Sequence, residues 1–131
     1  MKRSVLEAIG FDYMTVTDKY RSAGVDLSRI TVAEGGSAND LWNQIKADMM
    51  DSRTVVMKTR GGAMMTDCAM TAYAAGDITD LLKVLDENTE VDRSVDPRGE
   101  NTRMYRGMYD TRERIIKGSM TEVFRALSPL R

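Results

Sequence analysis

The stretch ITVAEGGSANDLW, residues 30–42, sets the expected fold of this 131-residue chain. Its first four residues are mostly β-branched, and that composition predicts a short strand. Gly35 and Gly36 then predict a tight turn. Ser37 predicts the N-cap of a helix over 38–51, because a serine side chain can accept a hydrogen bond from a free amide of the first helical turn.

The same order of elements recurs further along the chain. Residues 54–58 predict a second strand, Gly61 and Gly62 follow it, and a helical segment comes next. The connection between the two strands holds one helix, which is typical of a right-handed βαβ unit. We therefore expect an α+β or α/β fold that is predominantly helical. Its small sheet would have two short strands, about 30–33 and 54–58, packed by helices, with a C-terminal helical arm.

Composition changes divide the chain into three parts. Residues 1–86 are expected to form a compact globular core, in which Gly10 ends or bends the first helix. Residues 87–100 are polar, contain a proline and a glycine, and lack periodicity, so they predict an exposed loop or linker. Residues 101–131 predict a basic C-terminal helical arm of the same domain.

The composition is that of a folded protein rather than a disordered one, with 42% apolar and 30% charged residues. No apolar run is long enough to span a membrane. The first residues contain a basic pair, but Glu7 interrupts the apolar residues and no small-residue cleavage site follows, so we expect no secretory signal peptide. The expected location is the cytoplasm or a particle assembled inside the cell.

Two residue types that carry much of enzyme chemistry are scarce. The chain has no histidine, and Cys68 is its only cysteine. A histidine general base is therefore absent, and a tetrahedral zinc site of the usual kind cannot be built. From this scarcity we expect no catalytic residues, no metal site, no cofactor and no enzymatic activity.

Charge is distributed unevenly between the body and the arm. Residues 1–92 carry 10 Lys and Arg against 15 Asp and Glu, whereas residues 93–131 carry 9 against 5. This asymmetry favours complementary contacts within or between molecules. Eleven methionines also favour adaptable contacts.

These features lead us to expect a non-enzymatic interaction or assembly subunit, a structural protein that self-associates or docks on a larger complex. A viral particle or its accessory machinery would be one such context. The arm interleaves arginine, tyrosine and methionine, residue types that are enriched at protein interfaces. The expected partner-binding residues are Arg103, Tyr105, Arg106, Met108, Tyr109, Arg112 and Phe124.

Two alternatives remain open. In one, the chain is a small phosphate- or nucleotide-binding module that uses both strand–Gly-Gly–helix turns, since helix N-termini at a strand edge attract anions. Its contact residues would be Gly35, Gly36, Ser37, Lys58, Arg60, Gly61 and Gly62. In the other, the basic arm binds nucleic acid, with arginine on phosphate and tyrosine stacked on bases.

Overall fold

The computed structural model describes residues 2–33, 35–58, 62–87 and 90–127. Its elements, in chain order, are α1 (Lys2–Ser22), β1 (Arg29–Val32), the 3-10 turn η1 (Gly35–Ala38), α2 (Asp40–Met50), β2 (Arg53–Met57), α3 (Gly62–Ala75), α4 (Leu81–Glu87), β3 (Val91–Val95), α5 (Gly99–Ile115), the π-helical turn η2 (Ile116–Met120) and α6 (Thr121–Leu127). The predicted helix-rich α/β fold is confirmed.

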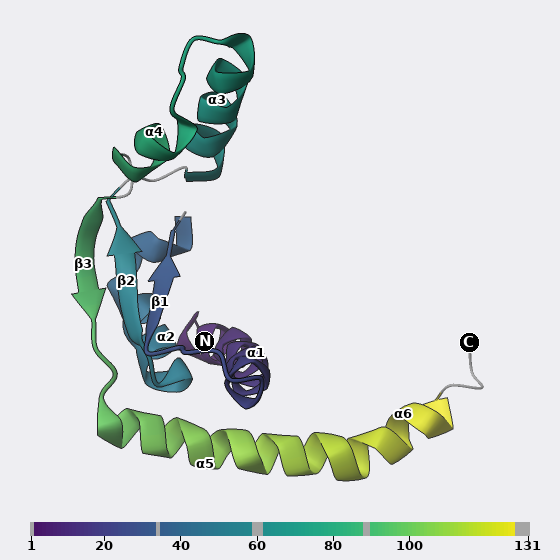
Figure 1. The fold of residues 1–131 in the computed structure, drawn as a ribbon. Helices are drawn as coiled ribbons and strands as arrows, with labels where there is room; N and C mark the ends of the chain where they lie inside the picture. The colour runs from purple at the N-terminus through teal and green to yellow at the C-terminus, as the bar shows by residue number, and fades with distance from the viewer. Residues whose placement is uncertain (1, 34, 59–61, 88–89, 128–131) are drawn as a thin grey trace.

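The sheet has three strands in the order β1-β2-β3 (Figure 1). β1 and β2 pair in parallel, with Arg29 opposite Arg53 and Val32 opposite Val56. α2 forms the crossover between them, as the βαβ prediction requires. β3 pairs antiparallel with the other side of β2. β1 is therefore the outer strand on one side of the sheet.

The third strand was missed because it lies inside the segment that was predicted to be an exposed loop. Val91–Val95 reads VDRSV, and its polar alternate positions hide the β pattern. The strand is largely exposed, and it forms the opposite edge of the sheet from β1. The sheet thus has three strands rather than two, while the division of the chain into core, linker and arm stays a prediction.

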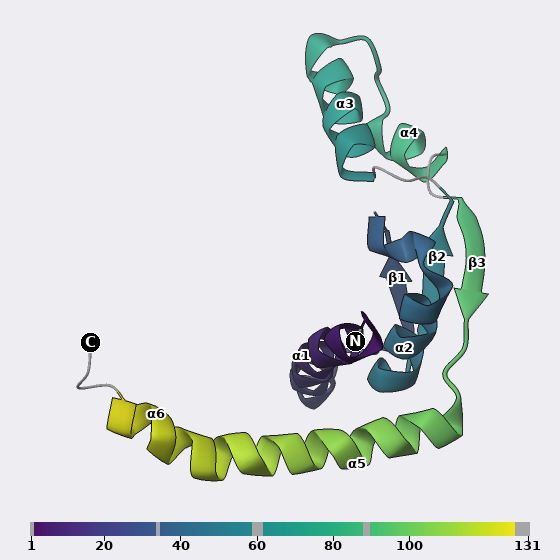
Figure 2. The same ribbon diagram turned by 180° about the vertical axis from the view of Figure 1, so that it is seen from behind.

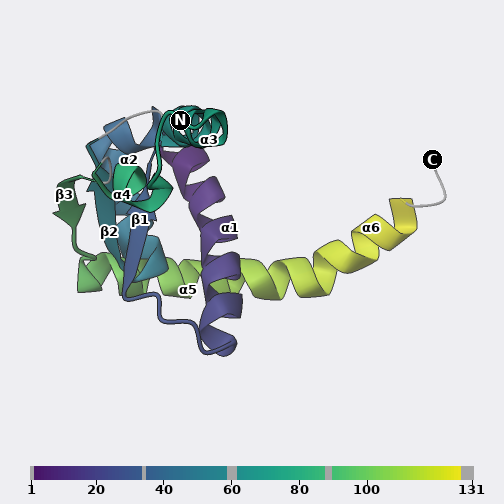
Figure 3. The ribbon, with the colours of Figure 1, turned by 45° about the horizontal axis from the view of Figure 1, so that its top comes forward.

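The core lies where α1 crosses α2 and α5 (Figure 3). Met14, Met49 and Tyr105 are each only 1% exposed there. The expectation that Gly10 ends or bends the first helix was wrong, since α1 continues through it. Gly10 serves helix packing instead: a Cβ at this position would clash with the Sδ of Met49 on α2.

Two parts of the chain extend away from this core. α3 and α4 pack on each other beyond the carboxyl end of β2 (Figures 1 and 2). α5 passes the body, and its continuation through η2 into α6 projects beyond it. Among the described residues, no helix is both long enough and apolar enough to cross a membrane.

Candidate functional site

The candidate site is the turn that joins β1 to α2. Asn39 is the N-cap of α2, and its side chain accepts a hydrogen bond from the backbone N–H of Trp42 at 3.0 Å. The prediction that Ser37 caps this helix was wrong, because Ser37 lies within the 3-10 turn, two residues before the cap. Ser37 is 3% exposed, and its carbonyl accepts a hydrogen bond from Nδ2 of Asn43 at 2.7 Å.

Asn43 holds the turn from inside the protein. The residue is fully buried on α2, and its Nδ2 donates a hydrogen bond to the Ser37 carbonyl. Its Oδ1 has no hydrogen-bond partner among the described residues. A buried acceptor without a partner is uncommon in folded proteins. The turn therefore has a fixed backbone and an unsatisfied polar atom beside it.

The two glycines of the turn are not required by its conformation. Neither Gly35 nor Gly36 has a positive φ. A Cβ at Gly35 would meet nothing within 4 Å, and one at Gly36 would make ordinary contact with the Trp42 ring at 3.6 Å. An alanine would fit at either position. The glycines leave the backbone of the turn open to approach from outside, which is a second common reason for glycine in a loop.

The charged side chains considered for this site are engaged in ion pairs. Arg93 on β3 donates to Oδ1 of Asp40 at 2.6 Å, and its guanidinium also reaches the Ser37 carbonyl at 3.5 Å. Lys58, expected to contact an anion, instead donates to both carboxylate oxygens of Glu90 at 3.0 Å. Arg93 also pairs with Asp92, so the guanidinium that reaches the first turn is held by two carboxylates.

The second predicted turn is only partly described. Arg60 and Gly61 lie outside the described residues, and Gly62 begins α3. The structure thus brings Gly35, Gly36 and Ser37 together in one turn. The anion-binding roles predicted for all of these residues stay predictions.

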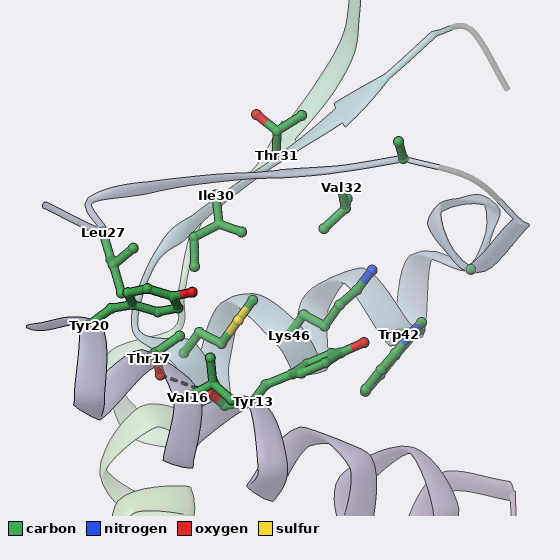
Figure 4. A pocket seen from close by; sticks show the side chains of 13 residues that line it. Tyr13, Val16, Thr17, Tyr20, Leu27, Ile30, Thr31, Val32, Trp42 and Lys46 are labelled. Atoms are coloured by element: carbon green, nitrogen blue, oxygen red, sulfur yellow. Dashed lines mark hydrogen bonds between the residues drawn. The ribbon is translucent and has the colours of Figure 1, made fainter. Parts of the chain in front are cut away.

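A groove of about 510 Å³ extends from Gly36 along the outer side of β1, between α1, β1 and α2 (Figure 4). Its walls are mainly apolar. Tyr13 of α1 and Trp42 of α2 stack with ring centroids 5.9 Å apart. Figure 4 shows Ile30 and Val32 of β1 pointing toward these helices.

Lys46 is the charged residue of the groove. It is 5% exposed, and its Nζ lies 5.4 Å from the centroid of the Trp42 ring. Burial lowers the pKa of Lys46 from 10.5 to about 8. Among the described residues no carboxylate forms an ion pair with it. Lys46 and Trp42 were not among the expected site residues, although their spacing of four residues places them on the same side of a helix.

The residues expected to bind a partner through the arm fall into two groups. Tyr105 and Tyr109 are 1% and 7% exposed, because they pack against α1. Arg106 forms two hydrogen bonds to Asp18, at 2.7 and 3.0 Å, and Arg112 donates to Asp12 at 3.0 Å. These four side chains are engaged within the chain.

The remaining three expected partner residues lie on the surface. Met108 is 46% exposed, Phe124 is 64% exposed, and Arg103 is exposed as well. Their contact with a partner stays a prediction.

The fold and the turn define a class of protein: an α/β unit with an open glycine turn at the carboxyl end of a parallel strand, where such folds bind ligands. The model of the C-terminal domain of the FGGY family of carbohydrate kinases matches residues 1–75. The chain therefore belongs to the FGGY family of carbohydrate kinases.

Individual relatives agree with this assignment. The chain is 23% identical over 108 residues to a xylulose kinase of Bacillus subtilis, a match that spans 82% of this chain and 22% of that protein. It is 31% identical over 96 residues to a xylulose kinase of Haemophilus influenzae, spanning 67% of this chain and 19% of that protein. The chain thus matches about a fifth of the length of these relatives.

Solved structures show the same fold. A gluconate kinase from Lactobacillus acidophilus superimposes with a TM-score of 0.71 and 18% identity, covering 88% of this chain and 23% of that one. A ligand-bound xylulose kinase from the same organism gives a TM-score of 0.68 and 18% identity, covering 96% and 24%.

Family membership corrects our main functional prediction. Membership of a kinase family contradicts the prediction of an assembly subunit without enzymatic activity. It equally contradicts the prediction of a virion component. The absence of histidine does not exclude a kinase, because phosphoryl transfer depends mainly on positioning and electrostatic stabilisation, which need no histidine. The alternative of a phosphate- or nucleotide-binding module agrees better with the family.

Proposed function

We propose that this chain is the nucleotide-holding part of a carbohydrate kinase, and that the β1–η1–α2 turn receives phosphate groups of a nucleoside triphosphate. The acceptor would be a sugar or sugar acid, as the names of the matched xylulose and gluconate kinases suggest. This chain matches only about a fifth to a quarter of the length of these proteins. Complete catalysis would therefore also require the parts of a kinase that this chain does not match.

The observation that carries the proposal is the unexplained glycine pair. Gly35 and Gly36 lie where β1 ends and α2 is about to begin, and the fold leaves room for a side chain at both. The amides and the positive end of a helix dipole favour an anion at such a place. A phosphate that contacts the backbone itself would explain why side chains are absent from a turn that could hold them.

The surrounding residues would fix the turn rather than perform chemistry. Asn43 holds the Ser37 carbonyl, and the Arg93 guanidinium lies 3.5 Å from the same carbonyl. The described residues bring together no group of three or more His, Cys, Asp and Glu side chains that could hold a metal ion. A nucleotide donor also implies a cytoplasmic location.

The test is nucleotide binding by Gly35→Ala. The added methyl would meet no protein atom, so the variant should fold normally, while the methyl would obstruct a phosphate at the backbone. We expect its affinity for nucleoside triphosphate, measured by calorimetry, to fall roughly tenfold or more. Gly107→Ala on the exposed face of α5 is the matched control, since a Cβ there also meets nothing within 4 Å.

Two results would overturn the proposal. One is equal nucleotide affinity for the wild-type protein and Gly35→Ala. The other is the absence of any thermal stabilisation of the wild-type protein at roughly millimolar nucleotide, because a ligand that binds the folded state must raise its stability.

A further inference from the structure

Arg93 joins three separate parts of the chain beside the β1–η1–α2 turn. It lies on β3, and one of its guanidinium nitrogens donates to Oδ1 of Asp40 at 2.6 Å. The same nitrogen lies 3.5 Å from the Ser37 carbonyl, and the other terminal nitrogen pairs with Asp92. These partners belong to the first turn of α2, to η1 and to β3 itself. A planar guanidinium suits this role, because its fixed N–H groups can serve several acceptors at once.

An irregularity in β3 accompanies this contact. Val56 of β2 lies opposite Arg93. The next residue of β2, Met57, lies opposite Val91 rather than Asp92, so β3 has one extra residue at this point of the ladder. Such a β-bulge changes the direction of the side chains beside it, and bulges are frequent next to functional sites. The bulge therefore falls where a β3 side chain reaches the turn.

The ion pair between Arg93 and Asp40 is poorly placed to stabilise the fold. The Asp40 side chain is 83% exposed, and that of Arg93 is 39% exposed. Ion pairs at such exposed positions contribute little to stability, because water solvates both charges when they separate. The pair does, however, determine where the Asp40 carboxylate lies.

The position of that carboxylate matters because Asp40 is the acidic residue in the first turn of α2. The amides and the positive dipole end of a helix attract a carboxylate there, as they attract a phosphate. The two anions also repel each other at short range. An unrestrained Asp40 would therefore compete with a phosphate at the turn. Its hydrogen bond to Arg93 holds the carboxylate against β3 and offsets its charge.

We propose that Arg93 is a positioning residue for nucleotide binding, which keeps the start of α2 open to phosphate by holding and neutralising the Asp40 carboxylate. The inference rests on the proposed nucleotide-binding function of the β1–η1–α2 turn. Arg93 acts through Asp40 and contacts no phosphate in this role, because Asp40 and Asp92 engage its guanidinium.

The experiment measures ATP affinity by calorimetry for the full wild-type chain, Arg93→Gln, Asp40→Asn and the variant that carries both substitutions. Arg93→Gln releases the Asp40 carboxylate and should weaken ATP binding roughly tenfold. Asp40→Asn removes the competing charge and should bind ATP at least as tightly as the wild type. The double variant should recover to within about twofold of the wild type, because no carboxylate remains to be released. A purely structural role of Arg93 predicts no such recovery.

Arg53→Gln is the matched control. Arg53 lies on β2 at the end of the parallel ladder that is remote from the turn, and it forms an exposed ion pair with Asp96 at 2.6 Å. Its loss should leave ATP affinity unchanged. The urea midpoints of Arg93→Gln and Arg53→Gln should be alike, since each variant loses one exposed ion pair of small energetic weight.

The outcomes separate this inference from the proposed function. Wild-type ATP affinity in Arg93→Gln would overturn the inference, and so would a double variant that binds as weakly as Arg93→Gln. In either case the proposed function stands if Gly35→Ala still lowers ATP affinity. Absence of ATP binding by the wild-type chain would overturn the proposed function and this inference together.

Discussion

Lys46 provides a quantitative test of how well the groove excludes water, because its ammonium group is buried among apolar side chains. The side chain is 5% exposed, and burial lowers its pKa from 10.5 to about 8. In the unfolded chain the lysine binds its proton more tightly than in the folded one. The stability of the protein should therefore rise with pH between about 8 and 10.5, the interval in which only the unfolded state holds the proton.

The substitution Lys46→Met isolates this effect, since methionine keeps an unbranched chain in the groove but cannot titrate. The shift in pKa corresponds to about 3 kcal/mol of stability that the wild-type protein lacks at neutral pH. The advantage of Lys46→Met over the wild type should be greatest near pH 7. It should shrink by about 2 kcal/mol by about pH 10.

Urea denaturation of both proteins across this pH range measures the difference. Trp42 is the only tryptophan and lies beside Lys46, so its fluorescence reports unfolding of this region. Lys83→Met, which removes an exposed lysine from α4, controls for the change in net charge. Parallel stability curves for Lys46→Met and the wild type would show that water reaches the ammonium group, and the reasoning from burial would be refuted.

Three further substitutions test the packing that positions the site. Gly10→Val should destabilise the protein by about 2 kcal/mol in urea denaturation, because its side chain collides with Met49 where α1 crosses α2; an unchanged midpoint would mean that the helices are less closely packed. Asp48→Ala should lower the unfolding free energy by about 2 kcal/mol, since this buried carboxylate accepts the amide at the start of α5 at 2.7 Å; retention of full stability would argue against that contact. Tyr105→Phe removes the 2.8 Å hydrogen bond to Glu7 and should reduce thermal stability by about 1 kcal/mol, and no loss would indicate that water replaces the hydroxyl.

The βαβ unit was predictable because its signals are local. The β-branched runs before each glycine pair gave both strands to within about one residue, and their parallel pairing followed from the helix between them. β3 was not predictable in the same way. Its sequence, VDRSV, lacks a strong apolar alternation, and only pairing with β2 makes it a strand. Gly10 was misinterpreted for a related reason, since its role depends on Met49, a residue distant in the chain.

The candidate site was predictable in part. The glycine pair and its position before a helix were visible in the sequence. The sequence could not show that the backbone conformation of the turn would also accept other residues at these two positions. The N-cap was misplaced because Ser37 and Asn39 are both good capping residues, and the intervening 3-10 turn decides between them. Arg93 could not be found, because it reaches the turn from the unpredicted strand.

The arm shows that part of a charge asymmetry can be satisfied within one chain, and its contact with a partner stays a prediction. The acidic body and basic arm are complementary, and part of this complementarity is met within the chain, where Arg106 pairs with Asp18 and Arg112 pairs with Asp12. Tyr105 and Tyr109, on the same helix as these arginines, belong to the buried core. A basic, aromatic helix is therefore evidence for a partner only after its contacts with its own domain are known.

α1 explains why this chain folds around a core and still exposes so much apolar surface. One side of the helix carries Met14 into the core with α2 and α5. The opposite stripe, centred on Tyr13 and Val16, is also apolar but remains exposed beside β1. α1 thus carries apolar side chains on two faces, of which one is buried in the core and the other lines the groove beside β1.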